Sequence, residues 1–281
     1  MVLGAHVTTA GGIHNSIKNG EDLECDAIQI FLANPNRWES KQPTDEVKEK
    51  FYEAWRNSPI IHVIVHDIHL SNLASPKQDV LEKSRIQFKK QMTLSQEIGV
   101  QYIVTHLGSH LGEGEEFGLK QLSDSFDYLF EHTEAPDVIV LLETTAGQGT
   151  NLGYCFEHIR DVIGMSKYSE RFGVCLDTCH VFAAGYDIRT ESDCAATFDK
   201  FDEIIGLDRL KAFHINDAKS EYQSRVDRHE HIAEGNIGAT AFSYILNDSR
   251  FENTPLIIET PKMNTMHGKN LTTLRGLINN N

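Results

Sequence analysis

Residues 62–66 read HVIVH, a short apolar run that ends on a residue able to bind a metal ion, and five later segments have the same form. These are YIVTH at 102–106, VIVLLE at 138–143, GVCLD at 173–177, LKAFH at 210–214 and PLIIE at 255–259. The final residues are His66, His106, Glu143, Asp177, His214 and Glu259, which lie 34 to 45 residues apart. One strand, one helix and two short loops use about that much chain in a βα repeat. We therefore predict parallel strands whose ends converge on one metal-binding face.

Two further apolar runs, at 2–7 and 27–32, precede these six and bring the number of expected strands to eight. Stretches with helical spacing lie between the runs, among them Leu119, Leu122, Phe126 and Leu129. Strand alternating with helix in this way predicts an α/β protein, a single (β/α)8 TIM barrel over residues 1–281. A doubly wound open sheet is the alternative. The closed barrel is favoured because all its strand ends point to one mouth, whereas those of an open sheet lie along one edge.

Proline and glycine mark several expected helix ends. Pro43 is expected to open the helix that carries Phe51, since proline is favoured at the first helical position. Gly99, Gly164 and Gly206 are expected to follow helix C-termini, where glycine is the usual residue.

The composition is that of an ordinary globular protein, with 40% hydrophobic and 24% charged residues. No apolar run reaches the roughly 18–20 residues that would span a membrane. The first residues lack the pattern of a signal peptide, so we expect a cytoplasmic protein with no membrane partner. The five cysteines include no C-x-x-C pair, which disfavours a thiolate zinc knuckle.

The formal net charge of −15 disfavours a nucleic-acid partner without excluding one. Attraction to phosphate is local and needs only one positive face. Three bound divalent ions would also change the charge from −15 to −9, with all six added charges at the metal site.

Three more residues of ligand type, His180, Asp227 and His229, lie beyond the strand ends. The nine side chains together are too many for one ion, but at three to four ligands per metal, with one bridging carboxylate, they serve about three. Imidazole and carboxylate ligands suit Zn²⁺ or Mn²⁺, and a site without thiolates indicates catalysis. Such a cluster suits phosphoryl chemistry.

A simpler interpretation is that these side chains are ordinary hydrogen-bonded polar residues, and a single strand-end histidine is more often that. We prefer this interpretation for His6, His110 and His231, which lie near the expected mouth. Cys179 is interpreted as a buried thiol rather than a ligand or nucleophile.

Five strings resemble the signature segments of bacterial-type endonuclease IV, a family of abasic-site endonucleases of DNA repair. They are THLGSH at 105–110, LLETTAGQGTNLG at 141–153, GVCLDTCHVFAAGYD at 173–187, HINDAKS at 214–220 and RVDRHEHIAEGNIG at 225–238. The similarity runs from GAHVTTAGG at 4–12 to LIIETP at 256–261, which is essentially the whole chain.

The resemblance implies a barrel with about three zinc ions per chain at its mouth, Mn²⁺ being an alternative for part of the zinc. Matching positions make Glu143 the central catalytic residue, a bridge between two zinc ions. The first implied metal group also contains His66 and His106. The second contains Asp177, His214 and Glu259, and the third contains His180, Asp227 and His229.

The implied reaction is hydrolysis of the phosphodiester on the 5′ side of an abasic site in double-stranded DNA, which leaves a 3′-hydroxyl and a 5′-deoxyribose phosphate. The family also removes blocking groups from 3′ ends. The resemblance further implies a monomer.

Loops at the expected mouth carry the candidate DNA contacts. By the resemblance, Arg37 and Leu70 enter the minor groove, and His69 stands where the family usually has a tyrosine. The plainest basic patch for phosphate contact comprises Lys219, Arg225 and Arg228, with solvated loop charges as the alternative. Other departures from the family pattern are Leu107, Thr144 and Ala233.

The competing function is a metal-dependent sugar isomerase or epimerase on a related TIM barrel. Such enzymes also place His, Asp and Glu at the mouth, typically about four ligands around one or two metals. The third group, His180, Asp227 and His229, separates the two functions, because a sugar enzyme does not need it.

Overall fold

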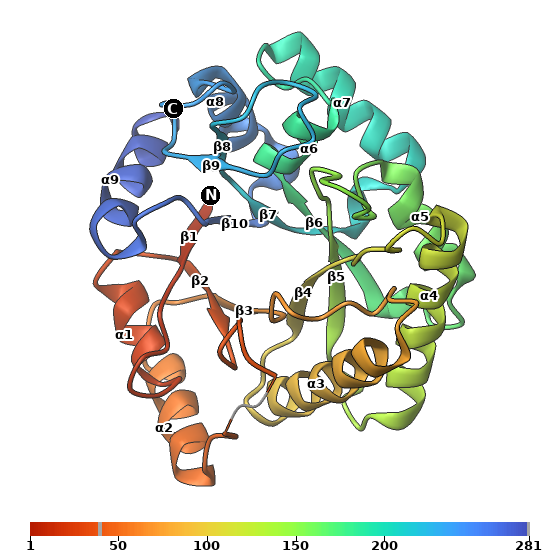
Figure 1. The fold of residues 1–281 in the computed structure, drawn as a ribbon. Helices are drawn as coiled ribbons and strands as arrows, with labels where there is room; N and C mark the ends of the chain where they lie inside the picture. Colours follow the sequence, from red (N-terminus) through yellow and green to blue (C-terminus); the bar gives the residue numbers. More distant parts are fainter. Residues whose placement is uncertain (39–40, 280–281) are drawn as a thin grey trace.

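The computed structural model describes residues 1–38 and 41–279, which form a closed barrel of eight parallel strands (Figure 1). The strands are β1 (Val2–His6), β2 (Ala27–Phe31), β3 (His62–His66), β4 (Tyr102–His106), β5 (Ile139–Glu143), β6 (Phe172–Asp177), β7 (Leu210–His214) and β10 (Pro255–Ile258). Closure comes from β1, which pairs with β2 on one side and with β10 on the other. The predicted TIM barrel is confirmed. Five of the six quoted segments end at the last residue of a barrel strand, and the sixth ends one residue beyond its strand.

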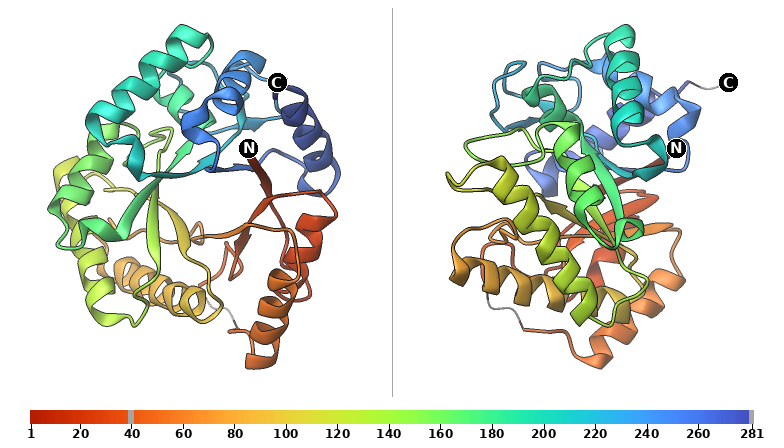
Figure 2. Two further views of the ribbon diagram at one scale, coloured as in Figure 1. Left: turned by 180° about the vertical axis from the view of Figure 1, so that it is seen from behind. Right: turned by 90° about the vertical axis from the view of Figure 1, so that its right-hand side faces the viewer.

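Most helices surround the barrel on the outside, and the short helix that follows β6 lies at the mouth (Figures 1 and 2). In the described part of the chain the helices are α1 (Asn15–Glu21), α2 (Asp45–Arg56), α3 (Gln78–Glu97), α4 (Glu115–His132), α5 (Phe156–Met165), α6 (Thr178–Ala184), α7 (Glu191–Ile204), α8 (Ala239–Asn247) and α9 (Met263–Gly276). Their apolar sides pack against the outward-facing strand residues in one large core. A short antiparallel pair, β8 (Asp217–Ala218) and β9 (His229–Glu230), was not expected from the sequence.

Two expected helix ends are wrong in detail. Helix α2 begins at Asp45 because the Thr44 side chain caps it by accepting a hydrogen bond from Val47 N, so Pro43 precedes the cap. Gly164 lies inside α5, which continues to Met165. Gly99 and Gly206 do follow helices, with φ of 74° and 95°, the left-handed region that glycine adopts without a steric penalty.

The barrel interior consists of an apolar layer beneath a polar one. Successive strand residues face opposite sides of a sheet, so every second side chain points inward. The apolar layer comprises Val2, Ala27, Ile64, Val104, Leu141, Cys175, Ala212 and Ile257. Two residues further along six of these strands stand the side chains that the sequence singled out, from His66 to Glu259. The alternation therefore places those polar side chains together at the mouth, above the apolar layer.

No helix in residues 1–38 or 41–279 combines the length and apolar character needed to cross a membrane.

Candidate metal centre

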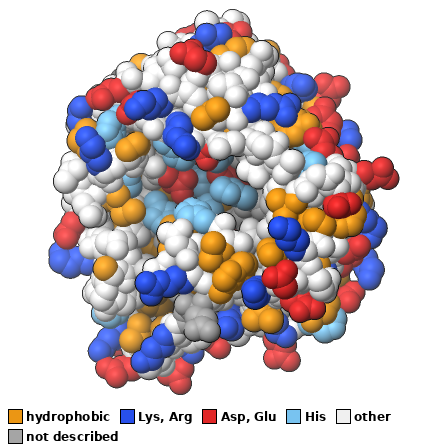
Figure 3. Space-filling view, viewed as in Figure 1, with side chains coloured by type: hydrophobic (Ala, Val, Ile, Leu, Met, Phe, Trp, Pro, Cys, Tyr) orange, Lys and Arg blue, Asp and Glu red, His pale blue; other side chains and the backbone are white. Residues whose placement is uncertain are grey.

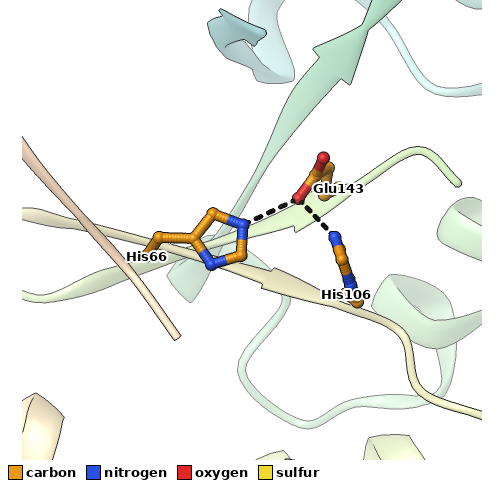
Figure 4. Close-up of side chains that lie close together, drawn as sticks. All are labelled: His66, His106 and Glu143. Atoms are coloured by element: carbon orange, nitrogen blue, oxygen red, sulfur yellow. Dashed lines mark hydrogen bonds and ion pairs between the residues drawn. The ribbon is translucent and has the colours of Figure 1, made fainter. Parts of the chain in front are cut away.

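The first group of candidate ligands comes from three neighbouring strands. His66 ends β3, His106 ends β4 and Glu143 ends β5. Figure 4 shows both imidazoles directed at one oxygen of the carboxylate. His66 Nε2 lies 3.2 Å and His106 Nε2 3.1 Å from Glu143 Oε2. Two imidazole nitrogens and a buried carboxylate oxygen that converge in this way match a zinc-type ligand set.

The second group uses the other oxygen of the same carboxylate. Glu143 Oε1 lies 3.0 Å from His214 Nδ1, which is in turn 3.2 Å from Glu259 Oε2 and 3.9 Å from Asp177 Oδ2. Glu143 therefore offers one oxygen to each group, as a bridging carboxylate does. Its complete burial at the centre of the barrel follows from its place at the end of β5.

The third group is assembled by elements beyond the strand ends. His180 stands in the first turn of α6, and Asp177 caps that helix by accepting a hydrogen bond from His180 N at 2.8 Å. Asp227 and His229 come from the segment that β8 and β9 enclose. Asp227 Oδ2 lies 3.1 Å from His180 Nε2, and Asp227 Oδ1 lies 3.4 Å from His229 Nε2.

Hydrogen bonds on the far side of each ring orient the histidines. His66 Nδ1 donates to the Asp67 carbonyl at 2.7 Å, and His180 Nδ1 to the Thr144 carbonyl at 2.8 Å. His214 Nε2 donates to Gln29 Oε1 at 2.8 Å. Each ring thereby keeps its other nitrogen free to face the centre, the usual arrangement of metal-binding histidines.

Two buried nitrogens at the centre lack a hydrogen bond. His180 Nε2 and His229 Nε2 have no hydrogen-bond partner among the described residues, although Asp227 lies within ion-pair distance of both. Buried polar atoms are rarely left unsatisfied, and a cation between these ligands would satisfy them. The residues present therefore fit divalent metals.

The charges of the site favour cations. Burial by itself raises the pKa of Glu143, but the charges of His106 and His214 outweigh it and hold that pKa well below its usual range. Burial lowers the pKa of His180, but Asp177 and Asp227 together outweigh it and raise that pKa well above its ordinary value. Glu143 therefore stays ionised, and the ring of His180 holds its proton at neutral pH. Divalent metals compete with this proton, so binding weakens as the pH falls.

Two amide side chains that were not predicted from the sequence support the ligands. Gln29 is buried in β2, where its Nε2 donates to Glu259 Oε1 at 2.7 Å and contacts His6 Nδ1 at 3.0 Å. Asn216 Nδ2 donates to Asp177 Oδ2 at 2.8 Å, and Asn216 Oδ1 accepts from Glu259 N at 2.7 Å. The signal for Gln29 was an amide in the middle of the apolar run AIQIF at 27–31.

The three histidines assigned to supporting roles have other partners. His6 lies 3.5 Å from Glu259 and is in no ligand group found among the described residues. His110 Nδ1 accepts from Gly114 N at 3.0 Å, and His231 Nδ1 contacts Asn270 Nδ2 at 3.1 Å.

Cys179 lies close enough to Asp177 and His229 to form a further ligand group with them. Burial raises the pKa of the Cys179 thiol, and its Sγ donates to the Arg228 carbonyl at 3.5 Å. A protonated thiol is a poor ligand, so the geometry agrees with a buried structural cysteine.

Two departures from the family pattern, Thr144 and Ala233, affect backbone geometry at the mouth. Thr144 Oγ1 accepts from Asp177 N at 2.9 Å, so the threonine hydroxyl helps to hold a ligand. Ala233 has a φ of 63°, in the left-handed region that favours glycine. The third, Leu107, is buried in the main core.

The candidate DNA contacts lie on loops at the mouth. Figure 3 shows a hollow with histidine and acidic side chains at its floor and Lys and Arg side chains around it. His69 N donates to the Pro35 carbonyl at 3.1 Å, which joins the loops that carry His69, Leu70 and the exposed Arg37. Burial, followed by the charge of His66, lowers the pKa of His69 to about 4, so its ring is neutral at pH 7.

The basic patch predicted from Lys219, Arg225 and Arg228 lies on the segment between β8 and β9, where all three are exposed. The Arg225 guanidinium lies 4.0 Å from the centre of the Tyr154 ring. DNA contact by these three residues stays a prediction.

A protein-family model described as xylose isomerase-like TIM barrel matches residues 17–277. A relative from Geotalea daltonii, named probable endonuclease 4, is 49% identical over 278 residues, which is 98% of this chain and 98% of its own length. A relative of the same name from Geobacter sulfurreducens is 44% identical over 98% of this chain and 94% of its own length.

Solved structures agree with these matches. The crystal structure of endonuclease IV from Thermus thermophilus matches with a TM-score of 0.87 at 28% identity, over 99% of this chain and 98% of that one. D-psicose 3-epimerase from Clostridium cellulolyticum matches with a TM-score of 0.66 at 14% identity, over 97% and 90%, a likeness of fold alone. The chain therefore belongs to the endonuclease IV family within the xylose isomerase-like TIM barrels.

Proposed function

We propose that this chain is an abasic-site endonuclease of DNA repair that hydrolyses the phosphodiester 5′ to the lesion with about three zinc ions. The products are a 3′-hydroxyl and a 5′-deoxyribose phosphate, and blocked 3′ ends are a second substrate. The observation that carries the metal assignment is Glu143, whose two oxygens face two different groups of ligands. The third group distinguishes the site from that of a sugar isomerase or epimerase, which would leave His180, Asp227 and His229 without a role.

Divalent metals bound here would lower the pKa of an attacking water and offset the charge on the phosphate and the departing oxygen. The protein's own contribution is to hold the ligands rigidly. Glu143 keeps the first two groups at a fixed separation, and Gln29 orients His214 and Glu259 together. Such preorganised charges stabilise a transition state without having to rearrange during the reaction.

Two cavities next to the centre would accommodate the DNA. One of about 810 Å³ is lined by His6, Phe31 and Arg37, among others. Another of about 220 Å³ is lined by residues that include His69 and His106. A duplex opened across these cavities would direct the lesion to the metals. Because a site that lacks its base is easier to deform, the enzyme gains selectivity without reading a sequence.

The active unit of this proposal is a monomer, in which one chain supplies all nine ligands. Zinc is the main metal of this proposal, with Mn²⁺ in part of the sites, and the enzyme acts in the cytoplasm.

The function is tested with a duplex that contains a single synthetic abasic site. We expect the metal-replete protein to cut 5′ to the lesion, to lose this activity after prolonged chelation and to regain it with added Zn²⁺. Metal analysis of the purified protein should give about three ions per chain. Failure of the metal-replete protein to cut would refute the function, and epimerisation of a ketohexose by the same preparation would favour the alternative.

Changing His69 to tyrosine should strengthen DNA binding more than it changes the chemical step. A phenol ring covers more of a vacated base stack than an imidazole does. Base–aromatic stacking contributes about 1–3 kcal/mol, so a fraction of it gives roughly threefold to fivefold tighter binding. The measurements are Kd for an abasic duplex and the single-turnover cutting rate, which should change less than about twofold.

The matched control is His132→Tyr on the outer helix α4, where the histidine stacks on Tyr128 away from the mouth. It should change neither quantity. A His69→Tyr variant that alters the cutting rate alone would contradict the proposed stacking role.

A further inference from the structure

The segment 217–230, here called the ligand hairpin, supplies two of the three ligands of the third group, Asp227 and His229. Strands β8 and β9 pair at its base, where Ala218 faces His229. Lys219 N donates to the Arg228 carbonyl at 2.8 Å and extends the pairing by one step. Beyond this step the two arms of the hairpin form no further strand pairing, so contacts with other parts of the protein hold the tip.

On one side the tip docks on the end of α6, the helix that carries His180. Backbone N–H groups of Gln223 and Arg225 donate to the carbonyls of Phe182 and Ala183 at 3.3 Å and 3.0 Å. The Tyr222 hydroxyl donates to the Gly185 carbonyl at 2.7 Å. These bonds use backbone carbonyls at the end of α6, of which that of Phe182 also accepts from Gly185 N at 3.2 Å.

The tip is held in a strained conformation. Gln223 and Arg225 have φ of 60° and 53°, in the left-handed region. For a residue other than glycine this region carries a steric cost, and such strain persists only where the surroundings enforce it.

On the other side the tip rests on the loop between β5 and α5. The Arg225 guanidinium lies 4.0 Å from the centre of the Tyr154 ring, and the Tyr154 hydroxyl donates to Glu115 Oε1 at 2.6 Å. The ring is seated against Gly147, where an added Cβ would lie 2.7 Å from Tyr154 Cβ. From the same loop, Gln148 Oε1 accepts from Asp227 N at 3.2 Å.

We propose that Tyr154 is a positioning residue for the third metal, which acts by stacking under Arg225 and holding the ligand hairpin so that Asp227 faces His180. This inference rests on the proposed three-metal site. Tyr154 is tied to helix α4 through Glu115, and His158 Nε2 lies 3.4 Å from the second oxygen of that carboxylate. The position of two ligands therefore depends on a ring outside all the ligand groups found in the described residues.

Zinc binding to the full-length protein measures this role directly. The metal-free chain is titrated with Zn²⁺ in competition with a chromophoric chelator. Loss of a cation–π contact at an exposed site corresponds to roughly a twofold to fivefold change in affinity. We expect Tyr154→Leu to weaken the third Zn²⁺ by that factor and the first two by less than twofold. Tyr154→Phe keeps the ring face and should recover most of the affinity.

The matched control is Tyr128→Leu, which removes another half-exposed tyrosine, also beneath an arginine at 5.1 Å, from the outer side of α4. It should leave all three affinities unchanged. Arg225→Met removes the same contact by changing its exposed partner. It provides a second variant if Tyr154→Leu folds poorly. It should weaken the third Zn²⁺ to a similar extent.

A coupling test separates positioning from general stability. In a background that carries both Asp227→Ala and His229→Ala, Tyr154→Leu should cause no further loss in zinc binding, because both ligands that it positions are gone. Equal weakening of all three ions, or an unchanged third ion in both Tyr154→Leu and Arg225→Met, would overturn the proposal. A wild-type chain that binds fewer than three Zn²⁺ would instead refute the three-metal assignment on which it rests.

Discussion

Glu143→Gln should reduce cutting of an abasic-site duplex by about 10³-fold or more. Metal stabilisation of a transition state contributes several kcal/mol, and each 1.36 kcal/mol corresponds to about a factor of ten in rate. Glu143 offers one oxygen to His66 and His106 and the other to His214. The amide keeps the volume but loses the charge and one of the two acceptor oxygens, so one group loses its ligand and the other keeps only a neutral carbonyl oxygen.

The metal content of Glu143→Gln should fall from about three ions toward one, because the third group does not require this carboxylate. Single-turnover cutting and metal analysis of the same sample provide the two readings. Glu131→Gln is the matched control, since Glu131 pairs with Lys167 on the outer surface and should retain both activity and metal. Wild-type cutting by Glu143→Gln would refute the bridging role.

Gly4→Ala should destabilise the barrel by on the order of 3 kcal/mol or more. Gly4 lies in β1, and a Cβ there would come within 1.9 Å of the Ala27 carbonyl oxygen and 2.9 Å of Ile257 Cδ1. A backbone oxygen of the adjacent strand cannot move without breaking the pairing between β1 and β2. We expect the thermal unfolding midpoint to fall by on the order of 10 °C.

The matched substitution Gly164→Ala should have the opposite effect. Gly164 lies inside α5, and a Cβ there would meet nothing within 4 Å. Alanine in a helix is favoured over glycine by about 0.5–1 kcal/mol, so the midpoint should rise slightly. Equal effects from the two substitutions would show that space around Gly4 does not limit the barrel.

The strands could be predicted because their signal is local. Apolar runs such as HVIVH at 62–66 and LKAFH at 210–214 recur at intervals that fit a βα repeat. Helix ends were harder to predict. Glycine often follows a helix C-terminus, but Gly164 lies inside α5, which continues to Met165. The short pairing of β8 with β9 has no local signal, since it depends on a hairpin that docks on α6.

The candidate ligands could be named from sequence because His, Asp and Glu at strand ends are informative by type and position. Their supports could not be named in the same way. Gln29 reaches Glu259 across 230 positions in the chain, and Tyr154 meets Arg225 only when two mouth loops fold together.

The sequence by itself favoured the barrel over an open sheet, and it determined the inward face of each strand and the set of side chains at the mouth, because period and residue type are properties of the chain. The tertiary structure alone decided which atoms of these side chains meet and which residues support them. The two oxygens of Glu143 face different groups, Gln29 joins His214 to Glu259, and Tyr154 supports the ligand hairpin. Each of these contacts links elements that are distant in sequence, and their geometry exists only once the barrel has closed.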